Sequence, residues 1–381
     1  MKNANKPKIA AGPGLFLAQP FDPKRKGWGS LKECCATAGA AGYRGGLQLP
    51  LWDGRLVDLD QASMSKDYCD DLKGKALEWG CPITTVANHL HTNLVVVSPA
   101  YAAQLSMFAP EIFHFASVKA LQDWADAQAK KTVLATKNFG FTEVAAFSGG
   151  VLFPYVYKWP AQPGGLVHNG MLHLARRWNP HFNFASEHGV RWAFELHPGM
   201  DLLCGGAMRM FLDKYASNHE ACCLNLDVSH KILMGVPMEQ IKAHIREFVE
   251  RIVMWHIKDA EYNPNGQWGV YSYLPWVQCA GQFRSLGDGQ VDYPALFALA
   301  RELGIDVVPV LEWECSKKGI AQGIVEEGAS YIESCIAGEA PAATADPKPH
   351  NDVFDAFAAG AGKKLISAMT GIPEALVVEA A

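Results

Sequence analysis

The chain repeats one pattern eight times: a short apolar segment rich in β-branched residues, followed by a segment with the periodicity of an amphipathic helix. We predict strands at residues 8–17, 43–51, 82–90, 143–149, 190–197, 221–228, 251–258 and 306–313. The predicted helices lie between them, at 30–41, 65–79, 117–137, 171–188, 205–217, 238–250, 293–303 and 319–336. Apolar strands that alternate with helices are typical of a parallel sheet with covered faces. Eight such units predict a (β/α)8 TIM barrel over residues 1–337.

A doubly wound parallel sheet is the second choice for the same pattern. No G-x-G-x-x-G motif opens a helix after the first predicted strand, which disfavours a dinucleotide-binding domain. Residues 261–289 form a long loop after the seventh strand, and residues 338–349 have the composition of an Ala/Pro linker. Beyond the linker, residues 350–381 predict a C-terminal extension with one or two short helices.

The composition is that of a folded protein with a large core, because 49% of the residues are apolar and 19% are charged. The formal net charge of −5 disfavours nucleic acid or an anionic membrane as the partner, since both attract basic surfaces. No segment resembles a signal peptide or approaches the roughly 18 apolar residues of a membrane helix. The cysteines include no C-x-x-C pair, which is typical of reduced thiols. We therefore expect a cytoplasmic protein.

Potential metal ligands stand where the last four predicted strands end. They are Glu195 in FELHPG, Asp227 in LDVSH, His256 in WHIKDAE and Glu312 in VLEWE. The carboxyl ends of neighbouring strands meet at one mouth of a barrel, where the chemistry of such barrels takes place. We therefore expect the four side chains to converge. Taken singly, each has the alternative interpretation of a solvated strand terminus or a helix-capping residue.

Two glutamates, one aspartate and one histidine offer three oxygen donors and one nitrogen donor. This set suits Mn²⁺, Mg²⁺, Co²⁺ or Fe²⁺ with open coordination positions better than a closed structural zinc site. Three crowded carboxylates would repel one another strongly without a cation between them. We predict one divalent metal ion, Mn²⁺ as first choice, bound by Glu195, Asp227, His256 and Glu312.

The motifs FELHPG, LDVSH, WHIKDAE, RSLGDGQVDY and VLEWE, in this order, resemble the sugar phosphate isomerase/epimerase superfamily with its xylose isomerase-like TIM barrel. The resemblance covers about residues 8–336. The segment FSGGVLFPYVYKWP, 147–160, is similar to longer members related to 3-oxo-glycoside-processing enzymes. The resemblance implies the same four metal ligands and a substrate-contacting role for His230. Candidate substrate-binding residues are His89, His197, Lys258, Arg284 and Trp159, of which His89 and Arg284 match positions used by superfamily members.

The resemblance implies a metal-dependent isomerase or epimerase that acts through an enediolate on a ketose, inosose or oxidised sugar. The ion would polarise the carbonyl group, and Glu195 and Glu312 would take and return the proton. The alternative is a lyase or deglycosidase that cleaves 3-oxo-glycosides by β-elimination, with His230 or His89 as proton donor. An apurinic endonuclease of the same superfold is disfavoured by the acidic charge balance. A non-catalytic sugar-binding or accessory subunit is a minor alternative.

The chain also departs from the ketose epimerases, because no arginine follows shortly after His256. We expect a small-molecule sugar or oxidised glycoside as the partner, and a homo-oligomer that can include a second subunit. Aromatic faces stack on sugar C–H surfaces, and the predicted loops carry Trp52, Tyr155, Tyr157, Trp159, Trp268 and Trp276. Rim packing is the alternative role for these rings. His230 has the alternative of a core histidine, and Lys258 with Asp259 that of a simple ion pair.

Overall fold

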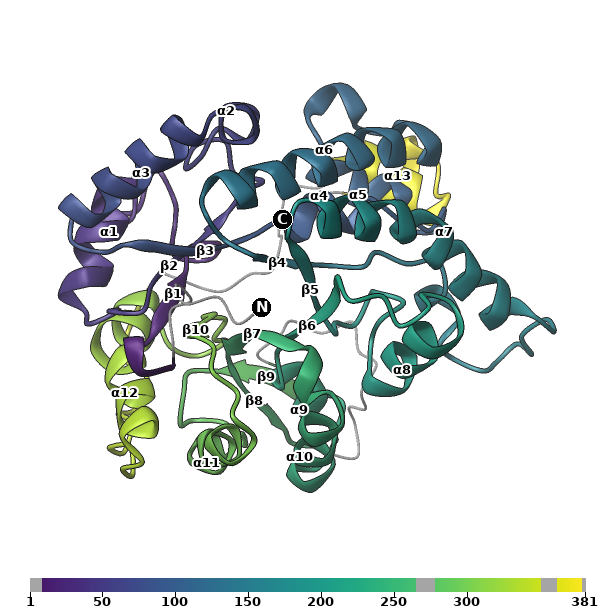
Figure 1. Cartoon of the computed structure of the whole chain (residues 1–381). Coiled ribbons are helices and arrows are strands. Elements are labelled where there is room, and N and C mark those ends of the chain that lie inside the picture. The colour runs from purple at the N-terminus through teal and green to yellow at the C-terminus, as the bar shows by residue number, and fades with distance from the viewer. Residues whose placement is uncertain (1–8, 265–277, 351–361, 379–381) are drawn as a thin grey trace.

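The computed structural model describes residues 9–264, 278–350 and 362–378. Its centre is a closed barrel of parallel strands in the order β1-β10-β7-β6-β5-β4-β3-β2 (Figure 1). These strands are β1 (Gly14–Phe16), β2 (Gly46–Pro50), β3 (Ile83–Ala87), β4 (Glu143–Ala146), β5 (Arg191–Glu195), β6 (Cys222–Leu226), β7 (Ile252–Ile257) and β10 (Pro309–Leu311). Each lies inside one of the eight predicted segments. The predicted barrel is confirmed, and the doubly wound alternative is wrong because β1 pairs with β10 and closes the sheet.

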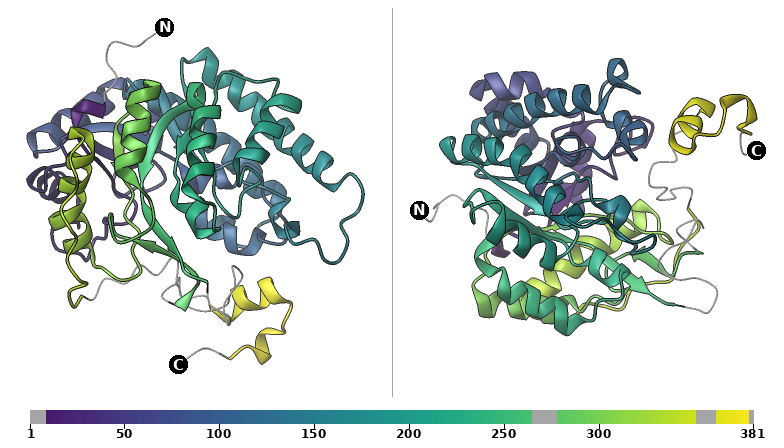
Figure 2. Two further views of the ribbon diagram at one scale, coloured as in Figure 1. Left: turned by 90° about the horizontal axis from the view of Figure 1, so that it is seen from below. Right: turned by 90° about the vertical axis from the view of Figure 1, so that its right-hand side faces the viewer.

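Helices surround the barrel in Figures 1 and 2. They are α1 (Leu31–Ala40), α2 (Leu59–Met64), α3 (Lys66–Glu78), α4 (His89–Asn93), α5 (Ala102–Leu105), α6 (Val118–Asn138), α7 (Leu166–Glu187), α8 (Gly205–Lys214), α9 (Ser229–Leu233), α10 (Met238–Glu247), α11 (Tyr293–Leu303), α12 (Ala329–Ala337) and α13 (Lys363–Thr370). The side chains of Ser30, Ser117 and Asp292 cap α1, α6 and α11 by accepting backbone N–H groups. Among the described helices, none combines the length and apolar composition needed to cross a membrane.

The core has two layers. Side chains between strands and helices form the larger apolar cluster, and a smaller cluster fills the barrel itself. Its buried members are Phe16, Ala87, Ala145, Ala193, Cys223, Val253, Met254, Val308 and Val310. Because every strand of a parallel barrel is covered on both faces, the continuous apolar runs of the sequence match this arrangement.

The predicted helix at 319–336 is divided in two. A π-helical stretch, η7 (Ala321–Gly328), precedes α12. A π-helix is rare, and its backbone hydrogen bonds do not follow the α-helical pattern. Within this stretch, the carbonyl of Ile324 accepts a hydrogen bond from the hydroxyl of Tyr43 at 2.8 Å. Gly323 lies against the indole of Trp313, where a Cβ would come within 2.2 Å of Nε1. The helix therefore approaches the end of β10 more closely than a larger residue would allow.

The long loop after β7 contains an antiparallel hairpin of β8 (Asp259–Tyr262) and β9 (Gly281–Arg284). The carboxylate of Asp259 accepts four backbone N–H groups, from Ala260, Gly287, Gly289 and Val291, at 2.8–3.1 Å. A Cβ at position 289 would lie 2.2 Å from Asp259 Oδ1. The GDG segment is thus shaped by this carboxylate, and Asp259 holds the loop instead of pairing with Lys258.

The residues predicted as a linker run along the barrel. Gln322 Nε2 donates to the carbonyls of Ala345 and Asp346, and Gln322 Oε1 accepts the N–H of Lys348. Farther on, α13 packs against α5, with Leu365 buried. Figure 2 shows α13 at the same end of the barrel as the hairpin β8–β9. Both segments therefore lie at the carboxyl end of the strands.

Candidate metal centre

The four predicted ligands meet at the carboxyl ends of four neighbouring strands. Glu195 is the last residue of β5, His256 lies in β7, and Asp227 and Glu312 directly follow β6 and β10. One ligating atom from each lies within 4.8 Å of every other, and all four residues are buried. The strand order β10-β7-β6-β5 brings them together. The solvated-terminus interpretation does not describe this arrangement.

Neighbouring groups orient three of these ligands. Asp227 Oδ1 accepts the N–H and the hydroxyl of Ser229 at 2.8 and 2.6 Å. Its Oδ2 makes no hydrogen bond of acceptable geometry within the described chain. Asn225 Nδ2 donates to Glu195 Oε2 at 3.2 Å. Gln48 Oε1 lies 2.8 Å from Nε2 of His256. A carbonyl oxygen at that distance keeps a proton on Nε2 and leaves Nδ1 to face the carboxylates.

His256 Nδ1 lies 3.1 Å from Glu195 Oε2 and 3.0 Å from Glu312 Oε2. Burial would lower the pKa of His256, but the charges of Glu312 and Glu195 raise it to about 10. Burial would raise the pKa of Glu195, but hydrogen bonds with His230, His256 and His89 hold it well below its usual value. The protein without metal therefore keeps ionised carboxylates around a protonated imidazole. A metal ion would replace that proton.

Lys258 is the fixed cation of the site. Its Nζ lies 3.0 Å from Asp227 Oδ2, 3.0 Å from Glu312 Oε2 and 3.1 Å from Glu314 Oε2. Burial would lower the pKa of Lys258, but these carboxylates, Asp227 first, raise it well above its usual value. Burial raises the pKa of Glu314, and the positive charge of Lys258 offsets part of that rise. Gln19 Nε2 donates to both Glu312 and Glu314 at 3.2 Å.

Three further histidines border the ligands. His230 Nε2 lies 3.0 Å from Glu195 Oε1, and its ring centroid is 4.1 Å from that of His197. His89, the first residue of α4, places Nε2 3.4 Å from Glu195 Oε2. Burial, with the nearby His230, lowers the pKa of His197 to about 3. His230 is therefore buried against Glu195 and His197. The alternative interpretation, a histidine within the apolar core, does not describe these contacts.

The side chains fit a divalent cation. Three carboxylates and one imidazole converge in a buried space, where Asp227 Oδ2 also faces Lys258 Nζ at 3.0 Å. Buried carboxylates repel one another unless a cation or hydrogen-bond donors compensate them. Oxygen donors with one nitrogen suit Mg²⁺, Mn²⁺, Co²⁺ or Fe²⁺. Glu195, Asp227, His256 and Glu312 are therefore the residues that would hold the ion.

A pocket of about 440 Å³ opens onto the ligands. Glu195, Glu312, Lys258, His89 and His197 belong to its lining, together with aromatic rings from Phe16, Trp52, Phe147 and Trp313. The ring centroids of Phe16 and Trp52 lie 5.6 and 5.9 Å from that of His89. This volume is within the usual range of small-molecule sites.

Two predicted substrate-binding residues are not brought to this pocket. Arg284 lies in β9 and pairs with Glu261 at 2.9 Å, so the hairpin holds its guanidinium. Trp159 is 77% exposed, because the segment between β4 and α7 extends outward from the barrel. Tyr155 and Tyr157 on that segment are also exposed. Trp52 does line the pocket. Trp268 and Trp276 lie outside the described residues.

Gln19, Gln48, Asn225 and Glu314 support the site and were not predicted. Gln48 and Asn225 are polar residues inside otherwise apolar strand segments, LQLPL and CCLNLD. A buried amide in a strand needs a partner, and that requirement is a usable signal. Glu314 is the second glutamate of VLEWE. No pattern in the sequence marks Gln19, which reaches the site because β1 lies beside β10.

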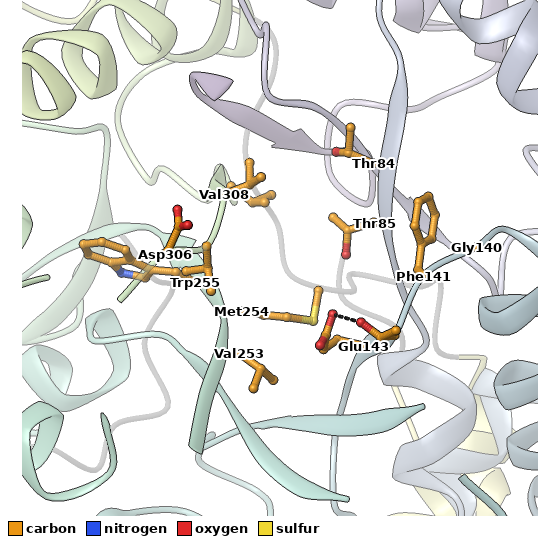
Figure 3. A pocket seen from close by; sticks show the side chains of 13 residues that line it. Thr84, Thr85, Gly140, Phe141, Glu143, Val253, Met254, Trp255, Asp306 and Val308 are labelled. Atoms are coloured by element: carbon orange, nitrogen blue, oxygen red, sulfur yellow. Dashed lines mark hydrogen bonds between the residues drawn. The ribbon is translucent and has the colours of Figure 1, made fainter. Parts of the chain in front are cut away.

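A second cavity, of about 70 Å³, lies at the amino ends of the strands (Figure 3). Its lining includes Thr85, Val253, Met254 and Val308, and it contains one hydrogen bond between Thr142 and Glu143, at 2.8 Å. Barrel chemistry takes place at the opposite end. We therefore assign this cavity no part in the site.

The model of the xylose isomerase-like TIM barrel family matches residues 35–335. Because that match covers most of the chain, the protein belongs to this family. No curated protein matches the sequence at a significant level.

Solved structures share the fold at low sequence identity. The 3-keto-D-glucoside 4-epimerase YcjR from E. coli is 13% identical, over 85% of this chain and 99% of its own, with a TM-score of 0.55. A xylose isomerase-like TIM barrel protein from Mycobacterium smegmatis, in complex with magnesium, is 15% identical over 87% and 99%, with a TM-score of 0.55. A xylose isomerase domain protein from Planctomyces limnophilus is 14% identical over 81% and 92%, with a TM-score of 0.51. At these identities the likeness establishes the fold alone.

Proposed function

We propose that this protein is a divalent-metal-dependent isomerase or epimerase that moves a proton next to the carbonyl group of a ketose, inosose or oxidised sugar. The observation that carries the proposal is the buried convergence of Glu195, Asp227, His256 and Glu312 within 4.8 Å, beside a pocket that Glu195 and Glu312 line. Family membership and the sugar epimerase among the structural neighbours support the same class. A site of this kind supports proton abstraction more directly than passive sugar binding.

A bound divalent ion would supply Lewis-acid polarisation of the sugar carbonyl. We assign proton removal and return to Glu195 and Glu312, which face His256 Nδ1 from two sides at 3.1 and 3.0 Å. Both carboxylates are held ionised, so either can accept a proton from carbon. Return to the opposite face of the same carbon gives epimerisation, and return to the neighbouring carbon gives isomerisation.

The remaining lining residues would hold and orient the sugar. His89 and His197 line the pocket beside Glu195 and offer ring nitrogens to sugar hydroxyls. Lys258 is a permanent cation 3.0 Å from Glu312 Oε2 and suits a sugar oxygen that gains negative charge. The rings of Trp52 and Phe147 provide faces for sugar C–H groups.

Mn²⁺ remains our first choice for the ion, with Mg²⁺, Co²⁺ and Fe²⁺ as alternatives. The ligand set holds three hard oxygen donors and one imidazole nitrogen, which Mn²⁺ and Mg²⁺ both accept. The magnesium complex of the Mycobacterium smegmatis neighbour supports a divalent ion in a protein of this fold. Elemental analysis of protein purified without added metal identifies the ion.

β-Elimination from a 3-oxo-glycoside is the second candidate. His230 favours it, because its Nε2 lies 3.0 Å from Glu195 Oε1, so a proton that Glu195 removes from carbon can pass to His230 and on to the leaving oxygen. The initial proton removal is the same as in isomerisation. Product analysis separates the two reactions, since only elimination releases the aglycone.

The test is proton exchange on wild-type protein and on Glu312→Gln, both saturated with Mn²⁺. We expect the wild-type protein to exchange solvent deuterium into the carbon beside the carbonyl of a ketose or 3-oxo-glycoside. Glu312→Gln removes one proton-transfer group and should slow exchange by about 10²–10⁴-fold. The matched control is Glu302→Gln on α11, whose side chain is 62% exposed. Exchange that survives in Glu312→Gln, or wild-type protein that binds no metal, would contradict the proposal.

A further inference from the structure

The pocket is larger than one sugar. Its volume is about 440 Å³. A hexose occupies about 180 Å³, the share of about six liquid waters. A free ketose bound against Glu195 and Glu312 would therefore leave more than half of the pocket to solvent. Sites that bind a small molecule tightly enclose most of its surface, so the remaining volume calls for a further part of the ligand.

The pocket lining changes character with distance from the metal ligands. Polar and charged groups come from strand ends and the first residues after them. The helices and loops beyond the strands contribute the polar Asn93 of α4 and five apolar side chains: Leu90, Leu105, Phe108, Met200 and Ile320. We call these five residues the apolar subsite. Arg25 also lines the pocket, and its guanidinium donates to the backbone carbonyls of Gln19 and Pro20.

The wall of the apolar subsite is braced from behind. Leu105 ends α5, and Phe108 ends η2 (Ser106–Phe108). Between them, the hydroxyl of Ser106 donates to the carbonyl of Ala103 at 2.7 Å and accepts the N–H of Phe115 at 3.1 Å. The C-terminal helix α13 packs on α5, and Lys364 Nζ lies 4.4 Å from the ring centroid of Phe115. The wall therefore belongs to a supported structure and does not depend on a ligand for its position.

Apolar walls discriminate between kinds of ligand. Leucine, isoleucine and phenylalanine side chains offer no hydrogen bonds, so sugar hydroxyls placed against them lose their water partners without compensation. An aromatic ring in the same place gains from apolar burial and from ring contacts with Phe108. The chemistry of the walls therefore favours an aromatic group over a second sugar.

We infer that the apolar subsite binds an aromatic group joined to the sugar, so that the substrate is an oxidised aryl glycoside and not a free ketose. This inference rests on the proposed function, because the sugar end of the same ligand occupies the metal centre. It deepens that function by giving the class of substituent that the sugar carries.

The experiment measures binding of two unreactive probes to the full chain loaded with Mn²⁺. Phenyl β-D-glucopyranoside and methyl β-D-glucopyranoside share the sugar and lack the carbonyl group, so neither is turned over. We expect calorimetry to give a dissociation constant about 10- to 100-fold lower for the phenyl compound, the range for burying one apolar group of this size. Equal dissociation constants, or no measurable binding of either probe, overturn the inference.

Variants locate the effect. Leu105→Gln places an amide of similar size in the subsite and should abolish most of the phenyl preference, with methyl glucoside binding unchanged within about twofold. Ile320→Gln is a second variant, on a different element of the pocket lining, because Ile320 is the N-cap of η7. The control is Leu77→Gln on α3, where the leucine is 66% exposed. A phenyl preference that persists in both subsite variants overturns the inference.

The outcome separates the subsite from the chemistry. Deuterium exchange into a ketose without any phenyl preference leaves the proposed function standing and removes the aryl substrate. The second outcome is a phenyl preference that Leu105→Gln abolishes, in a protein that exchanges no proton. The apolar subsite is then a binding site, and the proposed reaction is wrong. If both measurements fail, both proposals are wrong.

Discussion

Replacing Gln48 by leucine tests whether the barrel interior sets the state of the metal-binding histidine. Gln48 is fully buried and its Oε1 lies 2.8 Å from His256 Nε2. Leucine has nearly the same size but accepts no hydrogen bond. With metal on Nδ1, the Nε2 proton must face position 48, and a buried donor without an acceptor costs about 1–3 kcal/mol. Without metal, no bond to Nδ1 fixes the ring, so it can turn away from position 48 and avoids part of that cost.

We therefore expect Gln48→Leu to weaken Mn²⁺ binding by about 10- to 100-fold, the usual effect of losing such a partner. Isothermal titration calorimetry on metal-stripped protein measures it, and circular dichroism checks that the fold persists. The control is Gln122→Leu. Gln122 lies on helix α6, and its Nε2 donates to the carbonyl of Val95 at 3.3 Å. Unchanged affinity in a folded Gln48→Leu protein would refute the assignment of Nδ1 as the ligating nitrogen.

Two further predictions concern stability. Gly289→Ala places a Cβ 2.2 Å from Asp259 Oδ1 and should lower the free energy of unfolding by about 1–3 kcal/mol. The control is Gly54→Ala, whose Cβ meets no atom within 4 Å and should leave the free energy of unfolding unchanged. Urea denaturation measures both variants. Burial lowers the pKa of His91 to about 4 and the pKa values of His197 and His244 to about 3. The unfolded chain binds these protons near pH 6.5, so this stability is present above pH 6.5 and is lost as pH falls towards 4. The three histidines contribute at most about 4 kcal/mol per pH unit, and Asp259, whose pKa burial raises to about 6, offsets about a third of that loss. A flat dependence between pH 6 and 4.5 would contradict this assignment.

The barrel and the convergence of the four candidate metal ligands were predictable because both follow from local pattern and strand order. Parallel strands with covered faces give continuous apolar runs, and each run ends where its strand reaches the barrel mouth. Glu195, Asp227, His256 and Glu312 stand at such ends, so chain order alone placed them side by side. The same reasoning placed Lys258 at the end of the seventh strand, and the resemblance to the superfamily suggested His89; both line the pocket.

The supporting residues were not predictable because they depend on barrel closure and loop shape. Gln48 reaches His256 across 208 residues of sequence, from the second strand to the seventh. Gln19 meets Glu312 only because β1 pairs with β10. Arg284 and Trp159 show the converse case, since their positions in the sequence suggested the site, whereas the pocket lining does not include them.

The charges at the centre would balance if one lysine and one divalent ion shared the site. Glu195, Asp227 and Glu312 bring three negative charges, and Lys258 with a divalent ion brings three positive ones. Glu314, whose pKa burial raises, is a fourth carboxylate beside this set, 3.1 Å from Lys258 Nζ. Without metal, the proton on His256 supplies only one of the two missing charges, in line with its pKa of about 10. Removing Lys258 would therefore leave the loaded site with an uncompensated negative charge, and buried charges left unpaired are costly.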